Sequence, residues 1–280
     1  MAMKDSEPDF RPVLNITIWI LAASSGSFLG LRIWGKHQRG RKLWWDDGIL
    51  IAAWICLLLS CILQSVDTHF GFGQRDADVT SQDILDMTRL VSVVAGFFLV
   101  LAAAWSKTSF ALTLLRLTIP TKKCFSVRGM IWFAIWSTNL AIAASGVFQW
   151  AQCWPLDKLW RQWLPGQCLR LGIVNGYNMF VAAYSGLMDI TLAMLPCKIF
   201  YPLRIQRDEK IGIVVAMGMG IFAGATSFMK IFAIYNINRI AAGPEHVVVL
   251  MILGTAESAI TIMAVSMPVL RTLLMGRDKT

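Results

Sequence analysis

The chain has 280 residues, of which 56% are hydrophobic and only 15% are charged, and its formal net charge at pH 7 is +9. Soluble domains average about 45–50% apolar and about 25% charged residues, so this composition excludes a soluble globule, a disordered chain and a small disulfide scaffold. A spanning helix needs about 20 apolar residues, so seven helices would leave only tails and short loops, with no room for a soluble catalytic or DNA-binding module.

Hydropathy predicts an all-α bundle of seven transmembrane helices. Residues 1–11 are expected to form an N-terminal tail, because they lack the basic start and cleavage site of a signal peptide. The helical domain is predicted over residues 12–275 and a short C-terminal tail over residues 276–280. The third helical pattern runs from Ile84 to Pro120, so this helix should be tilted or extend beyond the bilayer. The helices are predicted over residues 12–34, 48–68, 89–112, 129–150, 174–197, 211–235 and 247–270.

Lysine and arginine predict the orientation of the bundle. Fifteen of the 26 basic residues fall in the 1–2, 3–4 and 5–6 loops and the C-terminal tail, and eight fall on the other face. Because basic short loops stay in the cytosol, we expect an extra-cytosolic N-terminus and a cytosolic C-terminus, in the endoplasmic reticulum or the plasma membrane. The net charge then indicates topology and attraction to the lipid bilayer, and no nucleic acid is expected as a partner.

The cysteines and glycines suggest covalent and packing contacts. Cys153 and Cys168 share the predicted outer loop between the fourth and fifth helices. An oxidising side favours a disulfide between them, and two free thiols are the alternative. No CxxC pair or metal-ligand spacing occurs, so no metal site and no cofactor are expected. Two glycine pairs have the spacing of close helix packing: Gly26 with Gly30, and Gly220 with Gly224.

The ionisable residues inside the predicted helices are the candidates for chemistry, since the motifs of soluble enzymes are missing. Charge in a bilayer is costly and normally pairs or faces a cavity. At about 1.5 Å per residue from the outer helix ends, Lys230 lies roughly 8 Å deep, Glu257 15 Å, Asp189 22 Å and Lys107 27 Å. Lys230 is expected to reach toward Glu257, and Lys107 to pair with Asp189. Snorkelling lysines and purely structural ion pairs are the alternatives.

Glu257 is the strongest of these candidates. A carboxyl near the bilayer midplane must be protonated, paired or solvated. A protonated carboxyl in an apolar cavity can act as a general acid, or equally as a structural hydrogen-bond donor. Further polar residues of the outer half could line a cup with Glu257 and Lys230, as in a small-molecule site: Gln64, Asp67, Gln149, Asn175 and Asn178. Asp46 and Asp47 are expected to be interface residues beside the basic first loop.

Several groups of residues occur in the order found in one family of membrane proteins. They are Arg32 with Trp44-Trp-Asp-Asp47, Gly71-Phe-Gly73, Lys107-Thr-Ser109 with Arg116, Cys153-Trp-Pro155 with Cys168, Asp189 and Pro196 followed by Lys210, and Glu257 with Pro268-Val-Leu-Arg271. Over residues 15–275 this set resembles the fungal rhodopsin-domain family, typified by the satratoxin-cluster membrane protein. The chain departs from the family at Gln74-Arg75, where a histidine is common, and lacks the long tail of receptor-like members.

The family name does not imply a light sensor here. A retinal Schiff base would need a lysine in the seventh helix, and residues 247–270 contain none. The third helix ends Leu-Leu-Arg-Leu where family A receptors have Asp-Arg-Tyr, so the chain does not carry that receptor signature either.

The resemblance implies a fungal source and a role in secondary metabolism. The leading hypothesis is a cofactor-independent cyclase or isomerase acting on an apolar polyketide or terpenoid dissolved in the membrane. Glu257 would be its buried acid, and Asp189 the second catalytic candidate. The residues expected to bind or orient the ligand are Lys230, Asp67, Gln149, Asn178 and Lys107. The alternatives are a receptor that couples an outer ligand to a cytosolic protein partner, and a transport or scaffold accessory.

Overall fold

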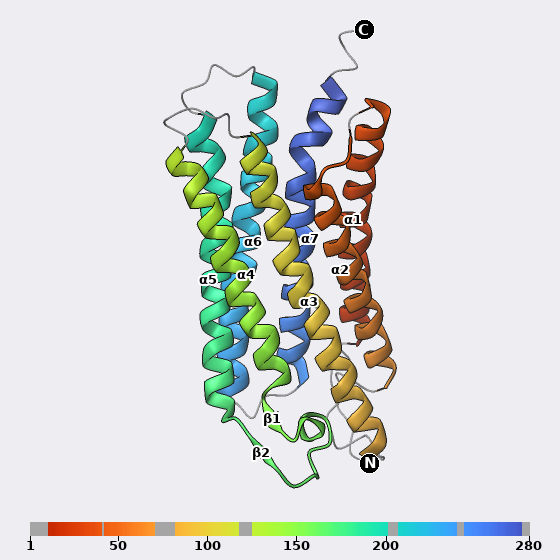
Figure 1. The fold of residues 1–280 in the computed structure, drawn as a ribbon. Coiled ribbons are helices and arrows are strands. Elements are labelled where there is room, and N and C mark those ends of the chain that lie inside the picture. Colours follow the sequence, from red (N-terminus) through yellow and green to blue (C-terminus); the bar gives the residue numbers. More distant parts are fainter. Residues whose placement is uncertain are drawn as a thin grey trace, which may run out of the picture.

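The computed structural model describes residues 11–40, 42–70, 82–117, 125–200, 207–239 and 244–275. Within them, seven helices are long and apolar enough to cross a membrane, which confirms the predicted seven-helix bundle (Figure 1). They are α1 (Arg11–Gln38), α2 (Trp45–His69), α3 (Gln82–Leu117), α4 (Phe125–Trp150), α5 (Leu171–Phe200), α6 (Arg207–Arg239) and α7 (Pro244–Met275). The C-terminal tail, residues 1–10 of the N-terminal tail, Gly71-Phe-Gly73, Gln74-Arg75 and Pro120 lie outside the described residues, as do the side chains of Pro196, Lys210 and Arg271.

The helices are longer than the hydropathy pattern predicts, because hydropathy marks the bilayer and not the helix ends. α3 has 36 residues, about 54 Å at the usual helical rise, and begins at Gln82 where hydropathy places its start near residue 89. Its polar first turns are held by helical contacts, since the Thr88 hydroxyl donates to the Ile84 carbonyl at 2.9 Å. The expectation of an unusually long third helix is therefore confirmed.

Neighbouring helices pack in chain order, and α7 closes the ring by packing on α1. α3 also contacts α5 and α7, so it lies inside the bundle (Figure 1). We call the end where α1, α3, α5 and α7 begin the hairpin end, and the opposite one the far end. α3 reaches beyond α7 at the hairpin end (Figure 1).

A disulfide-linked hairpin joins α4 to α5. Its strands β1 (Cys153–Trp154) and β2 (Gln167–Cys168) pair antiparallel, with the 3-10 helix η3 (Leu156–Leu159) between them. The Cys153–Cys168 bond is formed, as predicted. The Trp163 indole donates to Asp86 Oδ2 at 3.2 Å, which ties the hairpin to the first turns of α3.

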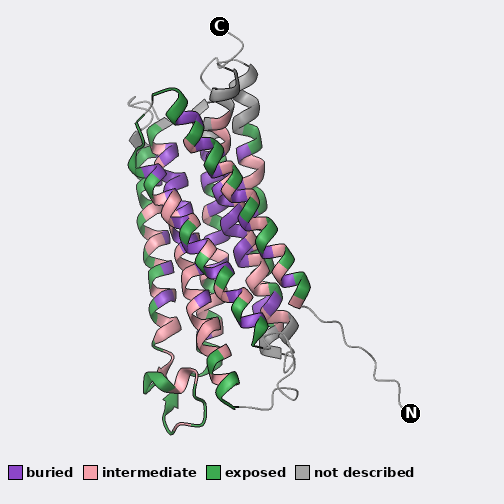
Figure 2. Ribbon diagram, turned by 90° about the vertical axis from the view of Figure 1, so that its right-hand side faces the viewer, coloured by how far each residue is buried: buried purple, intermediate pink, exposed green. Residues whose placement is uncertain are grey.

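The burial pattern is that of a protein solvated by lipid. Large apolar side chains such as Trp136, Leu140 and Phe222 are exposed, while many serines, threonines and charged groups are buried. Figure 2 shows exposed and buried residues alternating along the helices. A water-soluble protein rarely exposes so extensive an apolar surface. The chain is therefore a multi-pass integral membrane protein.

Glycines set the close approach of α5 and α6. A Cβ atom on Gly220 would lie 2.7 Å from the Cβ of Ala193, and one on Gly224 would lie 2.8 Å from Ile190 Cγ1. The packing expected for this glycine pair is confirmed. In the other pair, a Cβ on Gly26 would meet Trp54 at 2.7 Å, whereas Gly30 has open space, so the prediction fails for Gly30.

Gly220→Ala is expected to lower the free energy of unfolding by about 1–3 kcal/mol, because the added methyl forces α5 and α6 apart. Gly218→Ala, on the same helix with nothing within 4 Å of its Cβ position, is the matched control. It should raise stability by up to about 1 kcal/mol through helix propensity. Thermal unfolding of the two variants in detergent measures the difference, and shifts of the same sign would contradict this account of the packing.

Candidate active site

Four charged side chains from four helices meet inside the bundle and form what we call the central quartet. It consists of Lys107 on α3, Asp189 on α5, Lys230 on α6 and Glu257 on α7. Lys107 Nζ lies 2.7 Å from Asp189 Oδ2 and 2.5 Å from Glu257 Oε1. Lys230 Nζ contacts the other carboxylate oxygen, Oε2, of Glu257. The structure thus contains both expected pairs and joins them through Lys107 and Glu257.

Ser185 completes this polar centre, one turn before Asp189 on α5. Its hydroxyl accepts from Lys107 Nζ at 2.5 Å and donates to Glu257 Oε1 at 3.0 Å. Ser185 was not among the residues predicted from the sequence. The signal that could have found it is the four-residue spacing from Asp189, which places both side chains on one helix face.

The quartet contains two cations and two anions, so its formal charges cancel. Lys107 and Glu257 are almost fully buried, with side chains 2% and 1% exposed, and charges at this depth persist only when they are paired. Glu257 is held by two ammonium groups, so of the three expected states (protonated, paired or solvated) the structure has the paired one.

The four charges also lie at one level, contrary to depths of 8–27 Å counted from the separate helix ends. The reason is stagger. α3 starts farther out than α7 at the hairpin end (Figure 1), so equal residue counts along two helices do not mean equal depths in the bilayer.

A cavity of about 320 Å³ lies between α3, α4, α5, α6 and α7 on the hairpin side of the quartet. Lys230, Glu257 and Ser185 line its inner end, and Gln152 and Val174 line it near the hairpin. Most of the wall between them is apolar, as is usual for small-molecule sites. The cavity is therefore a mostly apolar chamber that ends on the Lys230–Glu257 ion pair.

Four side-chain amides line this wall, those of Gln149, Gln152, Asn175 and Asn178. Gln149 Nε2 donates to the Val93 carbonyl at 2.9 Å. A Cβ atom on Gly96 would lie 2.7 Å from that nitrogen, so a side chain there would push the Gln149 amide aside. Asn178 also lines the cavity, and within the described part of the chain its amide has no hydrogen-bond partner. Its amide is thus available to a ligand.

The cavity gathers most of the predicted ligand-binding residues. Glu257, Lys230, Gln149 and Asn178 line it, as does Asn175. Lys107 and Asp189 do not line it; Lys107 contacts Glu257 from behind, and Asp189 contacts Lys107.

Asp67 and Gln64 do not belong to this cavity, so the prediction that they line the cup is wrong. They lie on α2, which packs on α3 and supplies no lining residue. Asp67 Oδ2 accepts a hydrogen bond from Ser92 of α3. Gln64 Nε2 donates to Ser60 Oγ at 2.9 Å.

Among the described residues, no group of three His, Cys, Asp or Glu side chains is placed to hold a metal ion.

A second ionic cluster, the far-end network, lies near the other end of the bundle. Arg32 of α1 is fully buried and contacts Asp47 Oδ1 at 2.9 Å and Asp46 Oδ2 at 2.8 Å. Lys36 Nζ lies 2.6 Å from Asp47 Oδ2. Asp46 and Asp47, expected as interface residues beside the basic first loop, are thus buried in ion pairs with Arg32 and Lys36.

The far-end network ties four helices together. Arg32 Nη1 donates to the Val265 carbonyl of α7 at 2.5 Å, and the Ser109 hydroxyl of α3 donates to the Asp46 carbonyl at 2.7 Å. The four charged residues of the network, Arg32, Lys36, Asp46 and Asp47, do not line the central cavity. The network therefore positions α1, α2, α3 and α7 and does not contact a ligand there.

These features define a seven-helix integral membrane protein with an internal cavity that ends on a buried ion pair. Residues 31–276 match the Fungal rhodopsin domain, and the chain belongs to that family, as its motifs suggested.

The chain is also similar to "Wortmanamides biosynthesis cluster protein C" of Talaromyces wortmannii. The two are 22% identical over 246 residues, a stretch that covers 86% of this chain and 66% of the other protein. The similarity thus spans just under two thirds of that relative. No solved structure matches the chain significantly.

Proposed function

We propose that the protein binds an apolar small molecule in the central cavity and isomerises or cyclises it by proton transfer, without a cofactor. The observation that carries the proposal is the Lys230–Glu257 pair at the inner end of a mostly apolar chamber. Proton transfer between positions of one molecule conserves its atoms and electrons, so it requires no co-reactant.

The two residues that line the cavity divide the work. Lys230 is 17% exposed, and its ammonium donates the proton. Glu257 holds that ammonium and accepts the proton that the substrate gives up. Fixed charges in a water-poor cavity stabilise developing charge more strongly than charges in water do. The proposal thus assigns proton donation to Lys230 and proton acceptance to Glu257, where the sequence suggested Glu257 alone as the acid.

Asp189 and Lys107, expected to be a catalytic residue and a ligand contact, are better assigned a positioning role. Lys107 holds Glu257 Oε1 at 2.5 Å and is itself held by Asp189 at 2.7 Å. A carboxylate fixed from behind keeps its second oxygen toward Lys230 and the cavity.

The biosynthetic context supports an apolar polyketide or terpenoid intermediate as substrate. A relative is named as a biosynthesis cluster protein. Small-molecule pockets span about 300–1,000 Å³, and the 320 Å³ cavity suits a compact molecule. We further propose that the hairpin end is extra-cytosolic, which places the Cys153–Cys168 bond on an oxidising side.

Deleting the gene in the source organism should make one intermediate accumulate while neighbouring transcripts stay unchanged. Complementation with Lys230→Met should leave that intermediate in place, because the proton donor is missing. Lys158→Met, in the hairpin outside the cavity, is the matched control and should restore the product. Comparative metabolite and transcript profiles measure both effects. Unchanged metabolites in the deletion strain would contradict the proposal.

A receptor is the second candidate, and one observation favours it. The quartet joins α3, α5, α6 and α7, so a ligand that parts Lys230 from Glu257 would alter contacts among four helices. Such a protein would couple its ligand to a protein partner at the far end. Loss of product together with its biosynthetic transcripts, and with no intermediate, would favour this function over the enzyme.

A further inference from the structure

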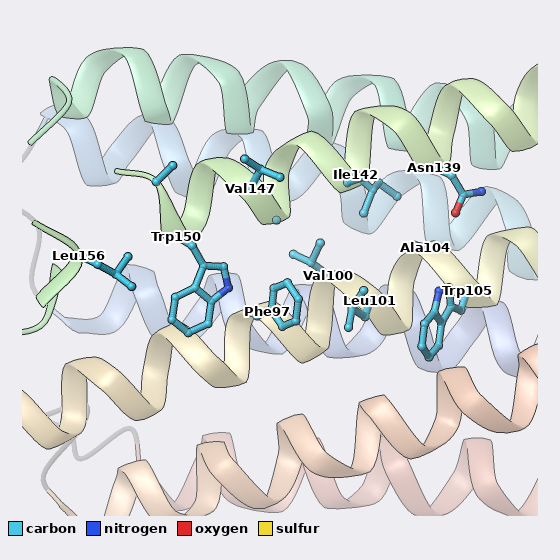
Figure 3. Close-up of a pocket in the computed structure, with 13 residues that line it drawn as sticks. Phe97, Val100, Leu101, Ala104, Trp105, Asn139, Ile142, Val147, Trp150 and Leu156 are labelled. Carbon is cyan, nitrogen blue, oxygen red and sulfur yellow. The ribbon is translucent and has the colours of Figure 1, made fainter. Parts of the chain in front are cut away.

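A second hollow of about 680 Å³ opens on the outer surface between α3 and α4, and we call it the α3/α4 groove (Figure 3). Hydrocarbon and aromatic side chains line it, including Phe97, Trp105 and Trp150, and Asn139 is the single amide among them. Val147, on its rim, is 67% exposed. In a membrane protein this surface faces lipid, so the groove is open to molecules dissolved in the bilayer.

The groove and the central cavity share a wall. Val100 of α3 and Ile142 of α4 line both of them. The two hollows are therefore separated there by aliphatic side chains that contact both sides. Rotamer changes of such side chains take place on the ps–ns timescale when they are free to move.

We infer that the α3/α4 groove is a lateral portal through which an apolar, membrane-dissolved molecule reaches the central cavity. The inference deepens the proposed function, on which it rests for the nature of that molecule. Three features support an apolar molecule from the bilayer as the occupant: the apolar lining of the groove, its position on the lipid-facing surface, and the wall that it shares with the cavity. The groove has no charged side chain, so a hydrated or ionic ligand would gain nothing there.

Asn139 gives the portal one polar contact. Its Nδ2 donates to Thr108 Oγ1 and to the Ile135 carbonyl, both at 2.8 Å. Both amide protons are therefore used within the protein, and the carbonyl oxygen is the group left for an incoming hydroxyl. An apolar molecule with a hydroxyl or enol suits this arrangement better than a pure hydrocarbon.

The test measures access to the cavity and requires no knowledge of the natural ligand. Ser145 lines the cavity and not the groove, so Ser145→Cys places a thiol inside. The purified full chain in phosphatidylcholine vesicles is treated with N-phenylmaleimide, which partitions into the bilayer. Peptide mass spectrometry gives the labelling rate at position 145, and labelling after denaturation shows that the thiol is intact.

Ala143→Trp fills the groove without lining the cavity, and Ala23→Trp adds the same bulk to the outer surface of α1 as a control. Ala143→Trp should slow labelling at least about fivefold, because the indole narrows the groove next to Ile142, which lines both hollows. Ala23→Trp should leave the rate unchanged. Equal rates in Ser145→Cys and in its two tryptophan derivatives, equal slowing by both tryptophans, or no labelling of folded Ser145→Cys would each overturn the portal. Because the readout is independent of turnover, failure of the portal and failure of the enzymatic proposal are distinguishable.

Discussion

Glu257→Gln is expected to lower the free energy of unfolding by about 3–5 kcal/mol, the usual loss when one partner of a buried ion pair is removed. The substitution leaves Lys107 and Lys230 facing a single remaining carboxylate, Asp189, in the middle of the bundle. Thermal unfolding of the purified protein in one detergent measures the loss.

A second variant separates charge imbalance from lost packing. Adding Lys230→Met to Glu257→Gln removes one charge of each sign and leaves the Lys107–Asp189 pair, 2.7 Å apart. The double variant should therefore be more stable than Glu257→Gln alone, yet should still fail to restore the product. If it is as unstable as the single variant, the balanced charge of the quartet is not what stabilises this region.

Arg32→Met should have an effect of similar size, about 3–5 kcal/mol, because it leaves two buried carboxylates short of a partner. Arg32 is fully buried and contacts Asp46, Asp47 and the Val265 carbonyl. Methionine keeps much of the side-chain volume, so the loss reports mainly on the polar contacts.

Arg89→Met is the matched control for this substitution. Arg89 lies 3.9 Å from Asp86 and is 34% exposed, so its ion pair is expected to be worth less than about 1 kcal/mol. Thermal unfolding under identical conditions compares the two variants. Equal losses at Arg32 and Arg89 would show that burial of the far-end network does not determine its contribution.

The fold was predictable because the apolar stretches are long and separated by polar loops. The pairing of Lys107 with Asp189 and of Lys230 with Glu257 was also predictable, because isolated charges in a bilayer must find partners. Their union into one quartet was not, since hydropathy carries no information on the stagger of one helix against another.

The error at Asp67 and the unforeseen burial of Asp46 have related causes. Asp67 and Gln149 are both polar and both lie in the outer half of their predicted helices. The arrangement of the helices nevertheless places Asp67 beside Ser92 and not in the cavity. Asp46 lies at the start of a helix, where sequence alone suggests an interface. Only the placement of Arg32 from the preceding helix shows that it is buried.

The two ionic clusters differ in how far apart their members lie along the chain, and this sets the order in which they can form during synthesis. Arg32 finds Asp46 and Asp47 only 14 and 15 residues later, so α1 and α2 can enter the membrane as a pair with Arg32 and Lys36 already neutralised. Lys107 is 82 residues before Asp189, and its other partner, Glu257, comes only with α7. The first helical pair can thus be neutral from the start, whereas the centre that closes the cavity is completed by the last helix.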